Sequence, residues 1–539
     1  MANSSQDTLF SYDSVKLPSA STHIRLLHLH PSPAPSSPLI CSLTIHPLHS
    51  SHSDSYVPND DDDNPPSGRP KFTAVSYAWG PGDRTAHASV NGDALLLITP
   101  SLDTALRHLR HAEDVLTLWI DQVCIDQSCD DEKSAQVVLM GRIFRAAEEV
   151  VVWLGPAADG SDELMEVFRE VGLEASELGL QRYLNPEGVG LLRPIIGEEV
   201  LDENHHMMMF RELLFESAPR FRRVLKALVE WNRWQWFGRV WVVQEFALAT
   251  RWPVLVCGGK RVSAGLVFLA ITVYGLVGGE LLRDGPLKSQ SRMDAEQWIR
   301  EVRLPLSQLA NLRLDWQVFE SGLGLGNPLL ALLRRMYEGN KMDATDERDR
   351  IFALLALACD ADKLGLKPDY SVDDCGPLFV RVARALIQTT GRLEVLSCSQ
   401  FPKASYHRLT TPLPICAADW RSDLHICAIE TISFWAGMVS PEPDCETIQK
   451  GVHYTLEMDE MDHKAPFMSK KGYVGLGPPK MMPGDMIVIF AGAHIPYVLR
   501  PSVDRDKHWE YVGEAYCDGV MDGEVWDESK LETFYLFDG

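Results

Sequence analysis

The stretch Phe72–Gly80, FTAVSYAWG, sets the pattern from which the fold can be inferred, because a strand-like apolar run ends there in a sharp turn. The same pattern returns at 115–121, VLTLWID, and at 150–156, VVVWLGP. Apolar residues at helical spacing separate the three runs, at 102–109 and at 128–147. Buried strands that alternate with helices are typical of a parallel sheet covered on both faces. We therefore predict an α/β domain.

The residues at the ends of these strands are candidates for a binding site, because ligands of open α/β sheets bind where the carboxyl ends of the strands meet the loops. The first strand ends at Ser76, Tyr77, Trp79 and Gly80, the second at Trp119 and Asp121, and the third at Trp153 and Gly155. Such residues would form an aromatic-walled crevice. In the alternative interpretation, each tryptophan only covers the hydrophobic core.

Glu245 is the single most informative residue of the sequence. If residues 240–249 are helical, a wheel of about 100° per residue places Glu245 within the apolar face formed by Trp241, Val242, Phe246 and Leu248. A buried carboxylate must find a partner or take up a proton, and either outcome shifts its pKa in the way that catalytic carboxylates need. The alternative is a structural ion pair with Arg239 or Arg142. If residues 240–243 instead form a strand, the helical wheel no longer predicts that Glu245 is buried.

Two further kinds of chemistry have weaker support in the sequence. Asp121 and Asp126 together with Glu245 would suit a magnesium site, although Asp126 also fits a turn before the next helix. Cys124 is a conceivable nucleophile, but none of the 17 histidines stands out as its partner, which favours a buried thiol. We expect no resident metal and no certain cofactor.

The sequence before and after these strands predicts further structural regions. Residues 1–71 are expected to hold a β-hairpin at 24–49 and a disordered insertion rich in Asp, Pro and Ser. The α/β domain would span 72–280, with a helical insertion at 157–235. A helical region would follow at 281–400, and a β-rich domain at 401–539, where apolar residues alternate between Gly and Pro.

Composition excludes several classes of function. The chain has 51 basic and 75 acidic residues, a formal net charge of −24, which argues against a nucleic-acid partner. The apolar run at 264–279 is shorter than the roughly 20 residues of a membrane span, so a buried helix is favoured. With no secretory signal and with 11 scattered cysteines, the sequence predicts a soluble cytoplasmic protein.

Three blocks of the sequence resemble the heterokaryon incompatibility (HET) domain family of filamentous fungi. They are 74–80 (AVSYAWG), 118–127 (LWIDQVCIDQ) continuing to the VWLG of 152–155, and 239–245 (RVWVVQE). Outside the domain, 349–355 (DRIFALL) and 368–371 (PDYS) look like the C-terminal extension common in such proteins.

This resemblance implies a cell-death effector of fungal non-self recognition. The HET fold is similar to TIR domains, which implies a TIR/flavodoxin-like sheet, and some TIR domains cleave NAD⁺ with one glutamate. The Trp-x-x-x-Glu pattern of that glutamate falls on Trp241 and Glu245. The resemblance therefore implies that Glu245 is catalytic and that NAD is a substrate. The residues expected to bind the substrate are Ser76, Trp79, Gly80, Trp119, Asp121 and Arg239.

Three functional hypotheses follow. The first is a HET effector that causes programmed cell death by hydrolysing NAD⁺, with Glu245 stabilising an oxocarbenium-like transition state. The second is a non-enzymatic module that works by self-association or by binding protein partners. The third is a metal-dependent hydrolase that uses Asp121 and Asp126.

Overall fold

The structure is a computed structural model, and it divides into two compact units that are described separately. One unit comprises Met1–Gly326 and Lys367–Ser371, and the other comprises Asn327–Leu366 and Val372–Gly539. The residues that the structure describes are 8–48, 70–183 except 93, 218–273, 305–337, 342–398 except 373 and 393, 417–421, 464–490, 495–502, 508–517 and 535–536. The acidic run at 60–63 lies outside these residues.

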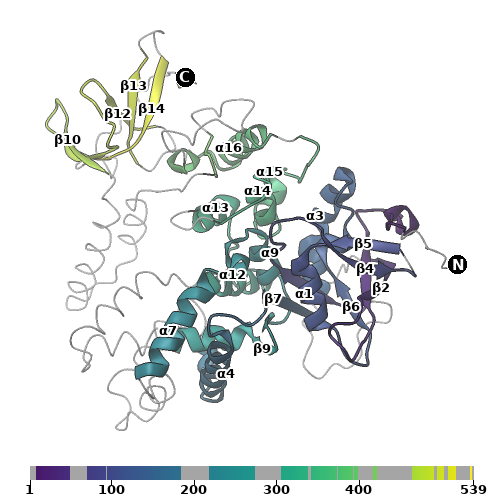
Figure 1. The fold of residues 1–539 in the computed structure, drawn as a ribbon. Helices are drawn as coiled ribbons and strands as arrows, with labels where there is room; N and C mark the ends of the chain where they lie inside the picture. Colours follow the sequence, from purple (N-terminus) through teal and green to yellow (C-terminus); the bar gives the residue numbers. More distant parts are fainter. Residues whose placement is uncertain are drawn as a thin grey trace. The chain divides into compact units, whose positions relative to one another are not determined.

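A nine-stranded mixed sheet forms the centre of the first unit (Figure 1). Its strands stand in the order β5-β4-β2-β1-β6-β3-β7-β8-β9. In chain order they are β1 (His23–Leu29), β2 (Ile40–Pro47), β3 (Thr73–Tyr77), β4 (Ala86–Val90), β5 (Ala94–Ile98), β6 (Leu116–Trp119), β7 (Glu149–Gly155), β8 (Val254–Cys257) and β9 (Lys260–Ser263).

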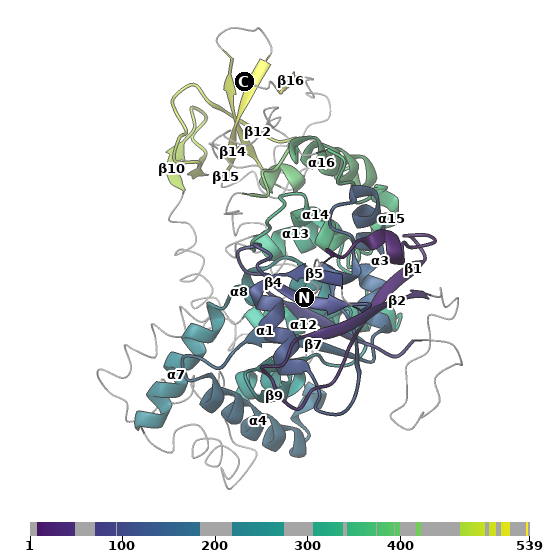
Figure 2. The same ribbon diagram turned by 45° about the vertical axis from the view of Figure 1, so that its right-hand side comes forward.

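The four strands β6, β3, β7 and β8 are parallel to one another. All four correspond to apolar runs of the sequence, and they are buried as continuous apolar strands of α/β proteins are. The full sheet is not purely parallel, however. The hairpin of β1 and β2, the purple pair in Figure 2, joins it with β1 antiparallel to β6, and the β4–β5 and β8–β9 pairs are antiparallel too.

Helices cover both faces of the parallel strands. On one face His108 of α1 (Pro100–Leu109) packs on Trp153 of β7, with ring centroids 4.8 Å apart. On the other, Phe144 of α3 (Asp130–Ala146) meets Trp119 of β6 edge to face at 5.6 Å. Because side chains alternate along a strand, Ser76 of β3 points to the same face as Trp119. That face also carries α9 (Trp241–Ala247).

The other helices that the structure names in this unit follow in chain order. They are η1 (Tyr12–Val15), α2 (Asp121–Cys124), α4 (Ser161–Glu177), η2 (Leu180–Tyr183), α7 (Ala218–Asn232), α8 (Gln235–Gly238) and α12 (Pro305–Glu320). Residues 264–273 are helical and their apolar side chains are buried, whereas 274–279 lie outside the described residues. In the described part of the chain, no helix is long and apolar enough to cross a membrane.

Two local predictions can be compared with the structure. The dipeptide Asn91-Gly92 predicts a tight hairpin turn, and the structure confirms it between β4 and β5, with positive φ angles of 51° and 108° that suit a type I′ turn. The pattern Ser128-x-x-Asp131 predicts a capping box, but this prediction is wrong, because Cys129 is the N-cap residue of α3. The Ser128 hydroxyl instead donates to Asp126 Oδ1 at 2.6 Å, a local bond that competes with capping.

The second unit contains helices followed by short strands. The helices are α13 (Leu329–Tyr337), α14 (Asp349–Leu355), α15 (Ala361–Leu364), α16 (Gly376–Thr390) and η3 (Glu394–Cys398). One small sheet has the order β10-β11-β15, from Ala465–Met468, Val474–Gly477 and Tyr516–Cys517. The other has the order β12-β13-β14-β16, from Met486–Val488, Tyr497–Pro501, His508–Glu514 and Tyr535–Leu536.

Candidate functional site

The centre of the candidate site is a hydrogen-bonded chain of three buried side chains. The Ser76 hydroxyl, near the carboxyl end of β3, donates to Glu245 Oε2 on α9. Trp236 of α8 in turn donates its indole N–H to Ser76 Oγ at 2.8 Å. Because the indole occupies the acceptor side of the hydroxyl, the serine proton is directed to the carboxylate. Strand β3 and the consecutive helices α8 and α9, which lie far from β3 in the sequence, therefore meet at one carboxylate.

Glu245 is only 2% exposed, and the helix that carries it begins at Trp241, so the wheel argument holds. Burial raises the pKa of Glu245 to about 7, against the positive charge of Arg239 and the hydrogen bond from Ser76, while Asp121 adds to the rise. Among the described residues neither Arg239 nor Arg142 forms an ion pair with Glu245. The alternative, a structural ion pair, is thus not found among these residues, and a neutral hydroxyl donates to the carboxylate instead.

Asp121 lies directly after β6 and forms the second acidic group of the site. Trp79 donates its indole N–H to the Asp121 carboxylate, with distances of 3.2 Å to Oδ1 and 3.0 Å to Oδ2. The backbone N–H of Gln122 donates to Asp121 Oδ1 at 2.7 Å. Burial raises the pKa of Asp121, whereas Arg239 and these two hydrogen bonds lower it. Asp121 and Trp79 are both partly exposed, unlike Glu245.

Arg239 links the two carboxyl groups electrostatically. It is partly exposed, and its Nη1 donates to the backbone oxygen of Tyr77, at the end of β3. Its positive charge lowers the pKa of both Asp121 and Glu245. The site therefore holds two acids with raised pKa values and one guanidinium at the end of the central parallel strand.

Two buried polar groups, one at the end of β3 and one in α2, have no hydrogen-bond partner among the residues that the structure describes. They are the Tyr77 hydroxyl and the Gln122 side-chain amide nitrogen. Burial raises the pKa of Tyr77 well above its usual value. The charges of Asp121 and Glu245 raise it further, whereas those of Arg239 and Arg84 lower it. Buried polar groups are normally paired, so these two donors are available to a bound molecule or to water.

The other residues expected at the site lie in the turn after β3 or in the hydrophobic core. Gly80 has a positive φ of 74°, which favours glycine in the turn after β3. Trp119 is fully buried against Phe144, so its ring packs within the core. Cys124 is also buried, and burial raises the pKa of its thiol to about 12, which makes it a poor nucleophile.

Asp126 belongs to a different network from Asp121. Its carboxylate accepts from Ser128, and its backbone N–H donates to Glu132 Oε1 at 2.7 Å. Within the ranges that the structure describes, no cluster of three or more His, Cys, Asp or Glu side chains could hold a metal ion. Among the described residues, the geometry therefore does not bring Asp121 and Asp126 together in one metal site.

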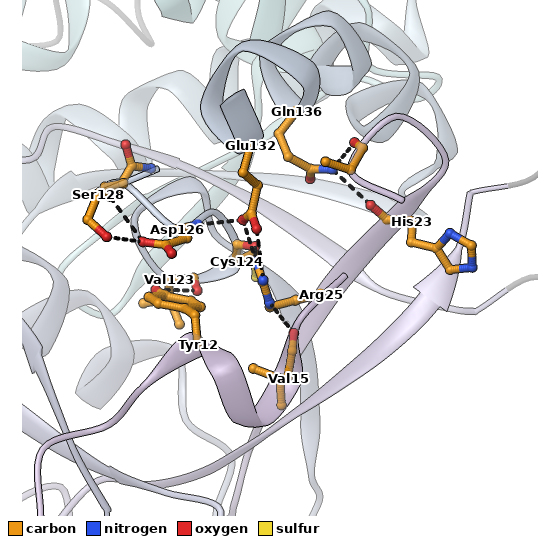
Figure 3. A network of polar contacts seen from close by, with 12 residues as sticks. Tyr12, Val15, His23, Arg25, Val123, Cys124, Asp126, Ser128, Glu132 and Gln136 are labelled. Carbon is orange, nitrogen blue, oxygen red and sulfur yellow. Dashed lines mark hydrogen bonds and ion pairs between the residues drawn. The ribbon is translucent and has the colours of Figure 1, made fainter. Parts of the chain in front are cut away.

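A buried ion pair holds the segment that follows Asp121 (Figure 3). Arg25 of β1, 1% exposed, forms a fork with Glu132 of α3, at 2.5 Å and 3.0 Å, and donates to the backbone oxygens of Val15 and Cys124. The Tyr12 hydroxyl donates to the backbone oxygen of Val123 at 2.9 Å. The N-terminal segment thus fixes residues 123–126, directly after Asp121.

Sequence reasoning missed two members of the site. Trp236 was not a candidate, because it lies in a four-residue helix outside the periodic segment, and Tyr77 was noted only as a strand-end residue. The signal that could have identified Trp236 is the aromatic pair Trp234 and Trp236 directly before the block at 239–245.

Comparison with known families identifies the class of protein that this fold and site define. The family described as heterokaryon incompatibility protein (HET) matches residues 72–245, which include Ser76, Asp121 and Glu245. A Het-6 beta-barrel domain matches residues 440–537. Residues 72–245 of this chain are therefore similar to the HET domain, and residues 440–537 to the Het-6 beta-barrel domain.

A similar individual protein is heterokaryon incompatibility protein 6, OR allele, of Neurospora crassa. It is 27% identical over 730 aligned positions, which cover 99% of this chain and 100% of that protein. No solved structure matches the chain. Both the matched family and this relative are described as heterokaryon incompatibility proteins.

Proposed function

We propose that this chain is a cell-death effector of fungal non-self recognition and that the Glu245 cluster is its active site. The observation that carries the proposal is the environment of Glu245: a buried carboxyl with a pKa of about 7, held by Ser76 at the end of a central parallel strand. Carboxyl groups with pKa values near the working pH are typical of catalytic sites. Cytoplasmic action is part of the proposal.

The strand order supports a TIR/flavodoxin-like core within the sheet. Numbered by their own sequence, the parallel strands β3, β6, β7 and β8 stand in the order 2-1-3-4. This is the order of doubly wound flavodoxin-like sheets, whose ligands bind between strands 1 and 3. Ser76 and Tyr77 lie at the end of strand 1, and Trp153 at the end of strand 3. Ser76, the hydrogen-bond partner of Glu245, is thus on a strand that borders the ligand position of such sheets, which supports the proposed site.

The reaction we propose is hydrolysis of NAD⁺. The bond between C1′ of the ribose and the nicotinamide nitrogen breaks, and its electron pair leaves with nicotinamide. The ionised form of Glu245 stabilises the oxocarbenium-like ribose, and a water oxygen then bonds to C1′ and loses a proton. Arg239 and Asp121 orient polar groups of the substrate, and the partly exposed Trp79 packs on one of its rings.

One observation favours a second candidate, a non-enzymatic module that acts through self-association or protein partners. Glu245 is only 2% exposed, and Ser76 and Trp236 are equally buried. A purely structural network would look the same in the free protein. In the enzymatic proposal α9 must therefore move when substrate binds, whereas in the non-enzymatic one it need not.

Expression in a fungal host separates the two candidates. The full chain and its Glu245→Gln variant are induced at matched protein levels, and cell viability and cellular NAD⁺ are followed together. The proposal expects that the full chain lowers NAD⁺ before viability falls and that the variant does neither. Killing by Glu245→Gln at the rate of the unchanged chain, with NAD⁺ constant, would replace the enzymatic proposal with the non-enzymatic one.

A further inference from the structure

The helix that carries Glu245 ends against a buried arginine from a distant part of the chain. The last carbonyl groups of a helix have no partners within it, and α9 has only seven residues. Arg313 of α12 donates from Nη1 to the backbone oxygens of Ala247, at 3.4 Å, and Ala249, and from Nη2 to that of Thr250 at 3.0 Å. One side chain thus binds three carbonyl groups at the end of α9.

Arg313 is built into the interior. It is 1% exposed, and its guanidinium lies 5.1 Å from the centroid of the Trp252 ring. Burial lowers the pKa of Arg313 to about 10, so the side chain still carries its charge at neutral pH. A buried cation needs acceptors, and the negative end of a helix dipole supplies them. The contacts therefore stabilise both the arginine and the end of α9.

Further bonds connect the same segment to α3. The Thr250 hydroxyl donates to the backbone oxygen of Arg145 at 2.6 Å. The Arg145 side chain forms an ion pair with Glu320 of α12 at 2.9 Å and lies 5.5 Å from the ring centroid of Trp316. Helices α3, α9 and α12 are thereby joined at one point, two to five residues after Glu245.

We propose that Arg313 is a positioning residue, which holds α9 so that the Glu245 carboxyl stays buried against Ser76. Helix α12 lies beyond the HET match at 72–245 and beyond the expected domain end at 280, yet it belongs to the same compact unit as the sheet. The functional domain then extends through α12.

Arg313 acts through the position of the helix rather than through its own charge. The charges that shift the pKa of Glu245 are those of Arg239, between α8 and α9, and Asp121, after β6. The neutral groups that face it are Ser76, with Trp236 behind, and Tyr77 also lies within electrostatic reach. Because burial is the largest cause of the raised pKa, a loosened α9 that admits water lowers the pKa of Glu245 toward its ordinary 4.5.

The test measures the titration of Glu245 in full-length Arg313→Lys and Arg313→Gln. Urea unfolding from about pH 4 to about pH 9 gives the stability of each protein, and subtracting the curve of the same protein carrying Glu245→Gln isolates the Glu245 titration. We expect the midpoint to fall from about 7 by roughly one unit or more in Arg313→Gln, and by less in Arg313→Lys, which keeps the charge with fewer donors.

Arg350→Lys is the matched control. Arg350 is 4% exposed and donates to the backbone oxygen of Met342 at 2.6 Å, but it belongs to the other unit. Its variant is expected to lose stability without moving the Glu245 midpoint. An unchanged midpoint in both Arg313 variants would overturn the proposal and leave Arg313 a structural residue. If Arg313→Gln does not fold, Arg313→Lys alone decides.

The positioning role of Arg313 depends on the proposed function in one respect, which is that Glu245 is the group that has to be positioned. The two can fail separately, because the midpoint is measured without substrate. A shifted midpoint in a protein that never consumes NAD⁺ would keep the positioning role and remove the enzymatic one. An unshifted midpoint in a protein that consumes NAD⁺ would do the reverse.

Discussion

Ser76 and Glu245 are 169 positions apart in the sequence, yet the hydroxyl of one donates a hydrogen bond to the carboxylate of the other in the interior. This bond joins the end of β3 to α9 and gives Glu245 a neutral partner in place of a cation. A carboxyl group paired in this way keeps a raised pKa, since a cation would have held it ionised.

The Trp236–Ser76 hydrogen bond should be visible as energetic coupling. We expect Trp236→Phe and Ser76→Ala to cost about 1–3 kcal/mol each in free energy of unfolding, and the double variant to cost less than the sum, because both remove the same bond. Denaturant unfolding of the four proteins measures the coupling.

Trp231→Phe is the control for that cycle. Trp231 is as buried as Trp236 and also packs on Phe237, but within the described part of the chain its indole N–H has no hydrogen-bond partner. Its replacement should combine additively with Ser76→Ala. Additive behaviour of Trp236→Phe as well would show that the bond contributes nothing to stability.

The stability of the protein should fall as pH rises through the titration of Glu245. The carboxyl has a pKa of about 7 when folded and about 4.5 when unfolded, so the folded state holds a proton that the unfolded state has released. Linkage then lowers the free energy of unfolding between these two pH values, by an amount on the order of 3 kcal/mol. The raised pKa of Asp121 acts in the same direction.

Urea unfolding of the unchanged protein and of Glu245→Gln across this range measures the effect. The glutamine cannot ionise, so the variant should lose less stability toward alkaline pH. A pH dependence that is identical in the two proteins would mean that folding does not raise the pKa of Glu245, contrary to the site described above.

The Arg25–Glu132 pair should matter far more than an exposed pair in the same domain. Arg25→Met leaves Glu132 with an uncompensated buried charge, for which we expect a loss of about 3–5 kcal/mol. Lys71 and Glu148, with side chains 62% and 54% exposed, form the comparison pair, and Lys71→Met should cost at most about 1 kcal/mol. Thermal unfolding compares them, and similar losses would contradict the assigned role of the buried fork.

Much of the fold could be predicted from the sequence because local pattern determines it. The parallel strands are continuous apolar runs, and α9 presents Glu245 on a face that is apolar on either side, so its burial follows from periodicity alone. The β1–β2 hairpin was also predictable. Its place beside β6 was not, because pairing between distant strands leaves no local signal.

The partners within the site were harder to predict for the same reason. Ser76 and Asp121 were candidates as strand-end residues, but nothing in the sequence gives the distance from Ser76 to Glu245 or makes Trp236 its second partner. Arg313 lies outside every recognised motif, and only the fold brings it to the end of α9.

NAD⁺ consumption by the purified full-length protein tests the central claim most directly. We expect nicotinamide to form with the unchanged protein, and its rate to fall by about 10²-fold or more in Glu245→Gln, which keeps the size of the side chain but cannot carry its charge. Turnover at equal rates in both proteins, or its absence in both while each still kills the host cell, would contradict the assignment of Glu245 as the catalytic residue.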